Sequence, residues 1–277
     1  MRHGITIFAT DRSMDVVALA REVEARGFDS LYLPEHTHIP ISRFTPPPTG
    51  EAELPEEYKR TLDPFVALAA AAAVTERITL GTGIALPAQR EPIVTAKAIA
   101  TLDLLSRGRT VLGVGFGWNE DELADHGVTM ADRRAVSREH VLAMQALWRD
   151  DVAGFTGDHV QIAPSWSWPK PVTGAVPVLI GGGAGPKLFA HIAEYAQGWI
   201  PIGGAGLGSA IPELQRVVAE AGRDPSTLEI VPFGSLPDRG KLEHFATIGV
   251  TECVFRVPSA GPDVVLPILD EWTQLIA

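Results

Sequence analysis

A repeated alternation of two patterns along the chain constrains its fold more than any other feature. Short runs rich in β-branched and aromatic residues alternate with longer stretches whose apolar residues recur at helical spacing. The eight strand-like runs are residues 4–9, 28–36, 78–87, 109–120, 176–183, 198–203, 228–234 and 251–257. Eight strand–helix units in about 250 residues predict a closed (β/α)8 TIM barrel, in which every strand is parallel and buried on both faces.

The main alternative is an open doubly wound sheet that binds a dinucleotide. Such a fold carries a GxGxxG sequence at the turn after its first strand, whereas this turn reads FATDRSMD. A length of 277 residues permits two small domains or one barrel, but no segment resembles an interdomain linker. We therefore expect a single domain over residues 1–277.

Two connections are long. The loop after the second strand, residues 37–62, contains five prolines and leaves the face where barrels keep their active sites. The insertion before the fifth strand, residues 150–175, includes HVQI at 159–162, which could form a small hairpin strand. Within the regular units, Ser13 is the expected N-cap of the first helix and Gly27 its C-terminal stop.

Composition limits the class of partner. A net charge of −11 opposes phosphate-tracking binding of nucleic acid and favours a small-molecule ligand. The longest apolar run, residues 65–74, is too short to cross a bilayer and is mostly alanine, so we expect a core helix and no membrane partner. Cys253 is the only cysteine and no export signal is visible, which predicts a cytoplasmic protein without disulfides.

Few catalytic side chains follow the strands. Glu35 and His36 end the second strand, and adjacent residues there point to opposite sides, so one can face the barrel mouth while the other braces a neighbouring loop. His36 is either a proton donor or a histidine packed under the proline-rich loop. No clusters of His, Asp or Glu occur at several strand ends, so we expect no metal site.

Two glycine-rich strand ends are candidate ligand contacts. GVGFGWNEDE at 113–122 lacks the lysine and spacing of a phosphate loop, but its glycines would let a flat ligand approach the backbone at Gly115 and Phe116. The competing interpretation is a flexible turn into a helix with acidic first-turn residues. LIGGGAGPKLFAHIAEYA at 179–196 places several backbone N–H groups at the start of a helix, which favours a phosphate site over a simple tight turn.

Together these motifs resemble the luciferase-like monooxygenase superfamily, the bacterial-luciferase-type barrels that use flavin or deazaflavin. The resemblance spans nearly the whole chain and rests on four segments. They are GFDSLYLPEH, ERITLGTGIALPAQREPIVTAKAIATLDLLSRGR, GVGFGWNEDE and GGGAGPKLFAHIAEYAQGW.

The resemblance implies a site. It places a non-prolyl cis peptide bond at Gly83-Ile84, in a bulge that supports the cofactor ring, and it places Glu35 and His36 beside that ring. It assigns the cofactor phosphate to three glycines of the turn after the fifth strand. They are Gly181, Gly182 and Gly183. Trp118 and Pro40 stand where some deazaflavin-dependent dehydrogenases carry a catalytic glutamate and a tryptophan, which leaves His36 as the only acid/base candidate carried over.

The resemblance also implies a function. It favours an oxidoreductase that transfers a hydride between coenzyme F420 and a small organic substrate. The first alternative is an FMN-dependent monooxygenase served by a separate reductase, and a lower alternative is a flavin-binding barrel without catalysis. A homodimer is expected through helices near strands two to four, where the alanine-rich helix 64–74 would allow close approach.

Overall fold

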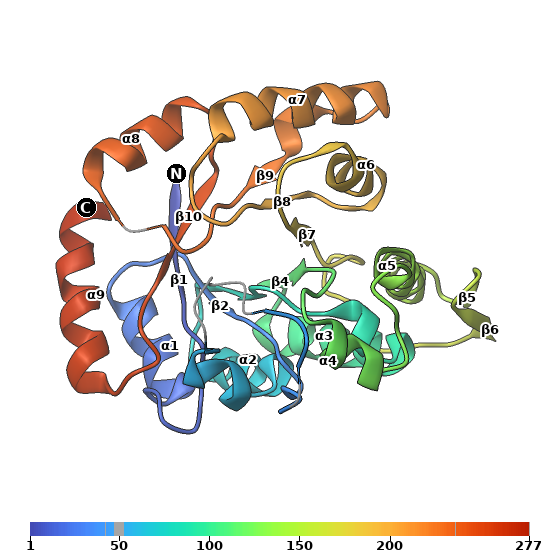
Figure 1. The fold of residues 1–277 in the computed structure, drawn as a ribbon, viewed down its shortest axis with the longest axis horizontal. Helices are drawn as coiled ribbons and strands as arrows, with labels where there is room; N and C mark the ends of the chain where they lie inside the picture. The colour runs from blue at the N-terminus through green and yellow to red at the C-terminus, as the bar shows by residue number, and fades with distance from the viewer. Residues whose placement is uncertain (42, 47–52, 236, 277) are drawn as a thin grey trace.

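A computed structural model describes residues 1–41, 43–46, 53–235 and 237–276. Eight strands form one sheet in the order β10-β1-β2-β3-β4-β7-β8-β9, and every neighbouring pair is parallel. A parallel bridge between Phe233 and Val254 joins the two edges and nearly closes the barrel (Figure 1). The strands are β1 (Arg2–Thr6), β2 (Ser30–Leu33), β3 (Thr79–Thr82), β4 (Thr110–Val114), β7 (Val178–Gly181), β8 (Gly198–Ile200), β9 (Glu229–Ile230) and β10 (Glu252–Arg256). The predicted (β/α)8 barrel is confirmed.

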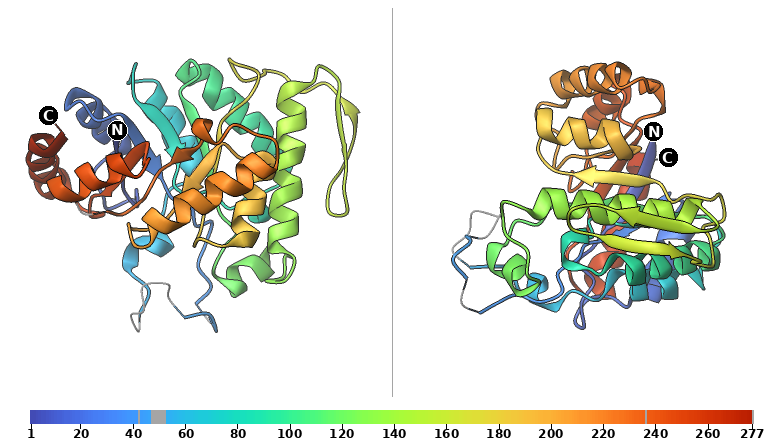
Figure 2. Two further views of the ribbon diagram at one scale, coloured as in Figure 1. Left: turned by 90° about the horizontal axis from the view of Figure 1, so that it is seen from above. Right: turned by 90° about the vertical axis from the view of Figure 1, so that its right-hand side faces the viewer.

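Helices surround the sheet, as the two views in Figure 2 show. The α-helices are α1 (Val16–Ala25), α2 (Pro64–Ala72), α3 (Pro92–Ser106), α4 (Glu120–Asp125), α5 (Arg133–Arg149), α6 (Pro186–Tyr195), α7 (Leu207–Glu220), α8 (Arg239–Thr247) and α9 (Pro262–Ile276). Three short 3-10 helices are η1 (Glu56–Arg60), η2 (Pro87–Gln89) and η3 (Pro225–Thr227). Among the described helices none is long and apolar enough to span a bilayer.

Local capping follows the sequence with one correction. The N-cap of α1 is Asp15, whose carboxylate accepts the N–H of Ala18, and the expectation of Ser13 is wrong. Ser13 instead accepts the N–H of Thr10 in the preceding turn, because the helix begins two residues later than a cap at Ser13 implies. Gly27 follows the end of α1 with φ of +84°, a conformation that favours glycine, as expected.

The insertion before the fifth barrel strand is an antiparallel hairpin of β5 (Ala153–Thr156) and β6 (Gln161–Ser165), so the expected hairpin strand is confirmed. It stands out from the barrel beside α5 (Figures 1 and 2). The Glu139 carboxylate of α5 accepts the backbone N–H groups of the hairpin turn, residues 158–160, at 2.7–3.1 Å. A single side chain of α5 therefore fixes the position of the turn.

The core has two layers. Most buried apolar side chains lie between the sheet and the helices, and a smaller cluster that includes Tyr32, Leu179 and Phe233 fills the barrel interior. At the end where the strands begin, the buried Glu252 carboxylate accepts from Ser30 and from Arg2 Nε. This network closes the amino-terminal end of the barrel, which leaves the carboxyl ends of the strands for function.

Candidate active site at the carboxyl ends of the strands

A buried histidine–glutamate pair lies at the end of β2. His36 Nδ1 is 2.9 and 3.1 Å from the two carboxylate oxygens of Glu122, and the two side chains are 7% and 1% exposed. Since a carboxylate only accepts, the Nδ1–H donates and the imidazole presents Nε2 as its second nitrogen. Glu122 comes from α4, which begins directly after β4. The structure thus places a second ionisable side chain, Glu122, against His36.

Glu35 points to the other side, as expected for neighbouring residues at a strand end. Its carboxylate accepts the Leu86 N–H at 2.7 Å and binds Arg90, while its own N–H donates to the Ile84 carbonyl. Burial raises the pKa of Glu35, and Arg90 opposes that rise. Arg90 also binds Asp63. Glu35 thus holds the backbone of residues 83–86 in place by hydrogen bonds.

The Gly83-Ile84 peptide bond is cis, as the resemblance implied. The Ile84 side chain lies between two of the predicted cofactor-binding glycines. A Cβ on Gly115 would be 1.8 Å from Ile84 Cδ1, and one on Gly181 would be 3.1 Å from Ile84 Cγ2. A side chain at 115 would therefore displace the end of the Ile84 side chain, and the predicted ligand contact at Gly115 stays a prediction.

The later glycines of the turn after β7 differ from these two. Gly182 has φ of +147°, a conformation that L side chains rarely adopt, so glycine is required there by the backbone. Around Gly183 there is no heavy atom of the described chain within 4 Å of an added Cβ. This turn leads directly into α6, whose first N–H groups have no intrahelical partner.

Four aromatic rings gather above the strand ends. Tyr58 of η1 has its ring centroid 4.7 Å from Phe8, 5.2 Å from His36 and 6.3 Å from Trp118. Trp118 is itself 5.9 Å from His36, edge to face. Burial raises the pKa of Tyr58. Rings from the segments after β1, β2 and β4 and from η1 therefore meet at one place, beside the histidine–glutamate pair.

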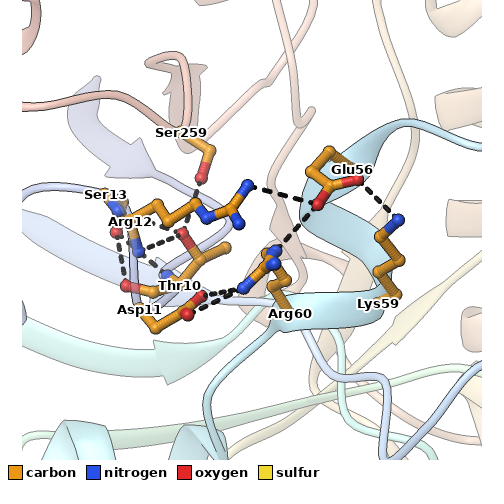
Figure 3. Close-up of polar contacts among 8 residues, drawn as sticks. All are labelled: Thr10, Asp11, Arg12, Ser13, Glu56, Lys59, Arg60 and Ser259. Atoms are coloured by element: carbon orange, nitrogen blue, oxygen red, sulfur yellow. Dashed lines mark hydrogen bonds and ion pairs between the residues drawn. The ribbon is translucent and has the colours of Figure 1, made fainter.

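Ion pairs hold η1 over this end of the barrel. Arg60 binds Asp11 through both carboxylate oxygens, at 2.7 and 3.0 Å, and Glu56 at 2.9 Å (Figure 3). Arg256, the last residue of β10, binds Glu57 at 2.8 Å. The loop after β2 is thus fastened at its far end, although its residues 42 and 47–52 lie outside the described residues.

Unpartnered buried polar groups concentrate at a neighbouring corner, where η2, α4 and α5 pack together through Ala88, Leu123 and Val136. Five side chains on or beside these elements have buried polar atoms with no hydrogen-bond partner among the described residues. They are Gln89, Asn119, Arg133, Arg134 and Ser137. Buried polar groups are nearly always paired, so water or a polar ligand would complete the hydrogen bonding at this corner.

Arg134 is one of two arginines at this corner, beside Arg133. Its guanidinium lies 4.3 Å from the ring centroid of Phe116, and that ring lies 5.1 Å from His191 of α6. Burial lowers the pKa of both Arg134 and His191. Asn119, 1% exposed, ends the segment after β4, and neither its amide oxygen nor its amide nitrogen is bonded within the described chain. Phe116, predicted as a cofactor contact, thus lies between a cation and the helix that follows the glycine turn.

These residues fit an anionic cofactor with hydrogen-bonding groups. Arg134 and the start of α6 suit a phosphate, and Asn119 offers both a donor and an acceptor. Asn119 and Glu122 belong to the motif GVGFGWNEDE, but the sequence pattern predicted no role for either residue. No sequence pattern pointed to Arg134. Within the described part of the chain, no group of three His, Cys, Asp or Glu side chains is placed to hold a metal ion.

The fold and the site define a parallel barrel whose functional groups all follow the carboxyl ends of its strands. Residues 3–236 match the family model described as luciferase-like monooxygenase, and the chain belongs to this family. It is 47% identical over 266 residues to an uncharacterised protein of Mycobacterium tuberculosis, covering 95% of this chain and 94% of the relative. It is 30% identical over 212 residues to an F420-dependent glucose-6-phosphate dehydrogenase of Amycolatopsis mediterranei, covering 74% and 58%.

Solved structures share the fold at low identity. The monooxygenase RslO1 of Streptomyces bottropensis has a TM-score of 0.81 and 18% identity, covering 100% of this chain and 98% of that one. An F420-dependent secondary alcohol dehydrogenase with an F420–acetone adduct has a TM-score of 0.79 and 20% identity, covering 99% and 97%. The oxygenating constituent of 3,6-diketocamphane monooxygenase of Pseudomonas putida, in complex with FMN, has a TM-score of 0.66 and 18% identity, covering 89% and 71%.

Proposed function

We propose that this chain is an F420-dependent oxidoreductase that transfers a hydride between the deazaflavin and a small organic substrate. The observation that carries the proposal is the buried His36–Glu122 pair at the strand ends. Hydride transfer to or from a carbonyl carbon needs a group that gives or takes a proton at the oxygen, and an imidazole fixed by a carboxylate suits that task. The F420-dependent relatives and the alcohol dehydrogenase fold support the cofactor.

When bound, F420 supplies a hydride acceptor or donor at its ring. The protein's own part is acid–base chemistry and positioning. Glu122 accepts from Nδ1 of His36, which leaves Nε2 to hold the proton that the substrate oxygen gains or loses. A positive charge that develops on the imidazole is stabilised by the adjacent carboxylate. The aromatic rings beside His36 exclude water from the pair.

The binding groups divide between the corner and the turn. Arg134 and the backbone of 182–183 would hold the cofactor phosphate at the start of α6, and Asn119 would bond to its polar chain. Gly115 would help to position Ile84, because it leaves room for the Ile84 side chain. Phe116 would help to position Arg134, because the Arg134 guanidinium stacks on its ring. Glu35 would act indirectly, by bracing Ile84 and its neighbours.

The alternative is an FMN-dependent monooxygenase, in which a separate reductase would supply reduced flavin. The structural likeness to RslO1 and to the FMN-bound diketocamphane monooxygenase favours it. The lower alternative, a barrel that binds flavin without catalysis, leaves the His36–Glu122 pair without a role. Titration of the purified protein with each cofactor, followed by fluorescence, separates these proposals. Micromolar binding of F420 and none of FMN supports the first, and the reverse result overturns it.

The same titration, carried out on a variant, tests whether the cofactor phosphate binds at Arg134. Arg134→Gln should weaken cofactor binding about tenfold or more, because a charge-assisted bond to an anion is lost. Arg138→Gln is the matched control, since Arg138 lies one turn further along α5 and pairs with Glu194 at the surface. Equal affinities of the two variants would contradict the assignment of the corner as the phosphate site.

We also infer a homodimer, in keeping with a cytoplasmic enzyme of this family. Support comes from exposed apolar side chains on the neighbouring helices α2 and α3. They are Val66, Ile93, Val94, Leu104 and Leu105. Large apolar side chains gathered on two adjacent helices commonly mark an interface between subunits.

A further inference from the structure

A buried tryptophan donates a hydrogen bond to the glycine turn after β7. The indole Nε1–H of Trp199, on β8, donates to the Gly182 carbonyl oxygen at 2.8 Å. The Trp199 ring also packs edge to face on Phe189 of α6, with 5.7 Å between the ring centroids. Because Trp199 is only 2% exposed, any effect that it has on a ligand must pass through the turn.

This hydrogen bond fixes the orientation of the peptide group between Gly182 and Gly183. The peptide is trans, since the cis bonds of the described chain are Gly83-Ile84 and Trp168-Pro169. In a trans peptide the carbonyl oxygen and the following N–H point in opposite directions. The Gly182 oxygen is directed into the protein at Trp199, so the Gly183 N–H points outward.

The Gly183 N–H is therefore the group that a ligand at this turn would meet first. Among the residues that the structure describes it donates to no acceptor, whereas the Gly182 N–H donates to the Ile200 carbonyl at 3.3 Å. The space beside Gly183 is open, as the distances around an added Cβ show. An outward N–H in open space suits an anionic acceptor such as a phosphate oxygen.

The two glycines do not hold this orientation by themselves. Glycine adopts positive and negative φ about equally, so a peptide between two glycines can turn over at little cost. The reversed peptide would present the Gly182 carbonyl oxygen in place of the Gly183 N–H, and that oxygen would repel a phosphate. The bond from Trp199 selects the orientation that attracts an anion.

Resting on the proposed function, we infer that Trp199 is a positioning residue for the cofactor phosphate. Its indole N–H holds the Gly182 carbonyl inward and thereby presents the Gly183 N–H to a phosphate oxygen. The cofactor ring gains nothing from this bond. Trp199 thus changes the affinity for a cofactor that carries a phosphate and leaves the affinity for the ring alone unchanged.

Ligands with and without the phosphate test this role in fluorescence titrations. The pairs are F420 with its chromophore lacking the phosphate-linked tail, and FMN with riboflavin. Trp199→Phe keeps an aromatic ring but removes the N–H, so it should weaken binding of the phosphate-bearing member about tenfold or more. Binding of the phosphate-free member should stay within about twofold. Equal weakening of both members, or of neither, would overturn the inference.

Trp148→Phe is the matched control. Trp148 is also 2% exposed, and its indole N–H also donates to a backbone carbonyl, that of Ala96 at 3.0 Å. It lies near the opposite end of α5 from Arg134. Both members of each pair should bind Trp148→Phe within about twofold of the original protein. If Trp148→Phe loses the phosphate-bearing ligands as Trp199→Phe does, Trp199 has no special role.

Nuclear magnetic resonance observes the peptide itself and needs no cofactor. Glycine labelled with carbon-13 at the carbonyl and with nitrogen-15 gives HNCO signals for Gly–Gly peptides alone. The chain has three such peptides, at residues 181–182, 182–183 and 203–204. Gly183→Ala removes the 182–183 signal and so assigns it.

Inorganic phosphate is the probe in this measurement. It should shift the 182–183 signal in the original protein and in Trp148→Phe, but not in Trp199→Phe. Circular dichroism shows whether each variant is folded, and the titration of the original protein needs no variant. A 182–183 signal that does not respond to phosphate in the original protein, or that responds equally in Trp199→Phe, would contradict the inference.

The two measurements separate this inference from the proposed function. If neither F420 nor FMN binds, but phosphate shifts the 182–183 signal only where Trp199 is kept, the role of Trp199 stands and the cofactor proposal fails. If a cofactor binds and Trp199→Phe changes both members of its pair alike, the role of Trp199 fails and the cofactor proposal stands.

Discussion

At the scale of single residues, the contact between His36 and Glu122 decides which nitrogen of the imidazole meets the substrate. In neutral histidine the carboxylate favours the tautomer with the proton on Nδ1, which leaves Nε2 without a proton in that tautomer. Glu122→Gln removes the charge that favours this form. Nitrogen-15 chemical shifts of His36 should then move toward a mixture of the two tautomers, and turnover should fall about tenfold or more.

Asp125→Asn is the control for that change, because Asp125 is on the same helix and pairs with the more exposed His38. It should leave the His36 shifts as they are. Cofactor affinity should stay within twofold in both variants, since neither carboxylate touches the corner of Arg134. Unaltered His36 shifts in Glu122→Gln would show that the pair does not set the tautomer.

Another residue-scale prediction concerns the glycines that line the barrel interior. A Cβ on Gly113 would be 2.1 Å from the backbone oxygen of Thr82, which cannot rotate away. Gly113→Ala should therefore lower the free energy of unfolding by about 1–3 kcal/mol. Gly183→Ala, at a place with no heavy atom within 4 Å, should change it by less than about 0.5 kcal/mol. Urea unfolding of both variants measures the difference, and equal stabilities would contradict the close packing of β3 on β4.

At the scale of elements, short segments outside the regular barrel position the site. The six-residue helix α4 supplies Glu122 to His36 and holds the segment after β2, through Asp121 to the backbone of Phe44 and Asp125 to His38. The helix η1 carries Tyr58 and is fixed by its own arginine. Neither helix is long enough to be stable alone, so tertiary contacts hold both in place.

The hairpin provides an element-scale prediction. Burial alone would raise the pKa of Glu139, but the N–H groups of residues 158–160 lower it below its ordinary value of 4.5. A lowered pKa means that this anchoring is fully present above about pH 4.5 and is lost as pH falls through the folded value. The protection of these three amides, which is the intrinsic exchange rate at a given pH divided by the observed rate, should therefore fall at acid pH in the original protein.

Glu139→Gln should show fast exchange at the same amides already at neutral pH, with little further change on acidification. Glu220→Gln is the control, because Glu220 is an exposed partner of Arg216 on α7. Slow exchange at residues 158–160 in Glu139→Gln would mean that β5 and β6 hold the turn without the carboxylate.

At the scale of the whole molecule, the proposed homodimer gives the main prediction. Val94 on α3 is 67% exposed, so Val94→Asp should not change the stability of one chain but should place a charge in the subunit interface. Sedimentation should give the mass of two chains for the original protein and of one 29.6 kDa chain for this variant. Val264→Asp on α9, also exposed, should remain dimeric. A single-chain mass for the original protein would remove the proposal.

The barrel could be predicted because its signals are local. Strand and helix periods, and the capping of helices such as α2 by Asp63, are read from a few adjacent residues. The strand ends were less certain. The fourth strand, expected over 109–120, ends at Val114 because the chain turns there to begin α4. The missed N-cap at Asp15 is of the same kind, an error of two residues in where a helix starts.

By itself, the sequence determined the alternating elements, the parallel barrel and the hairpin insertion, whereas the cis bond at Gly83-Ile84 was implied by the resemblance to a known family. Only the tertiary structure decided that Glu122 forms a hydrogen bond with His36, 86 residues away. It also decided that Glu35 forms an ion pair with Arg90. Parallel strands bring their carboxyl ends to one face, so residues distant in sequence become neighbours there. Which of them touch depends on the turns after each strand, and a periodic pattern carries no information about those turns.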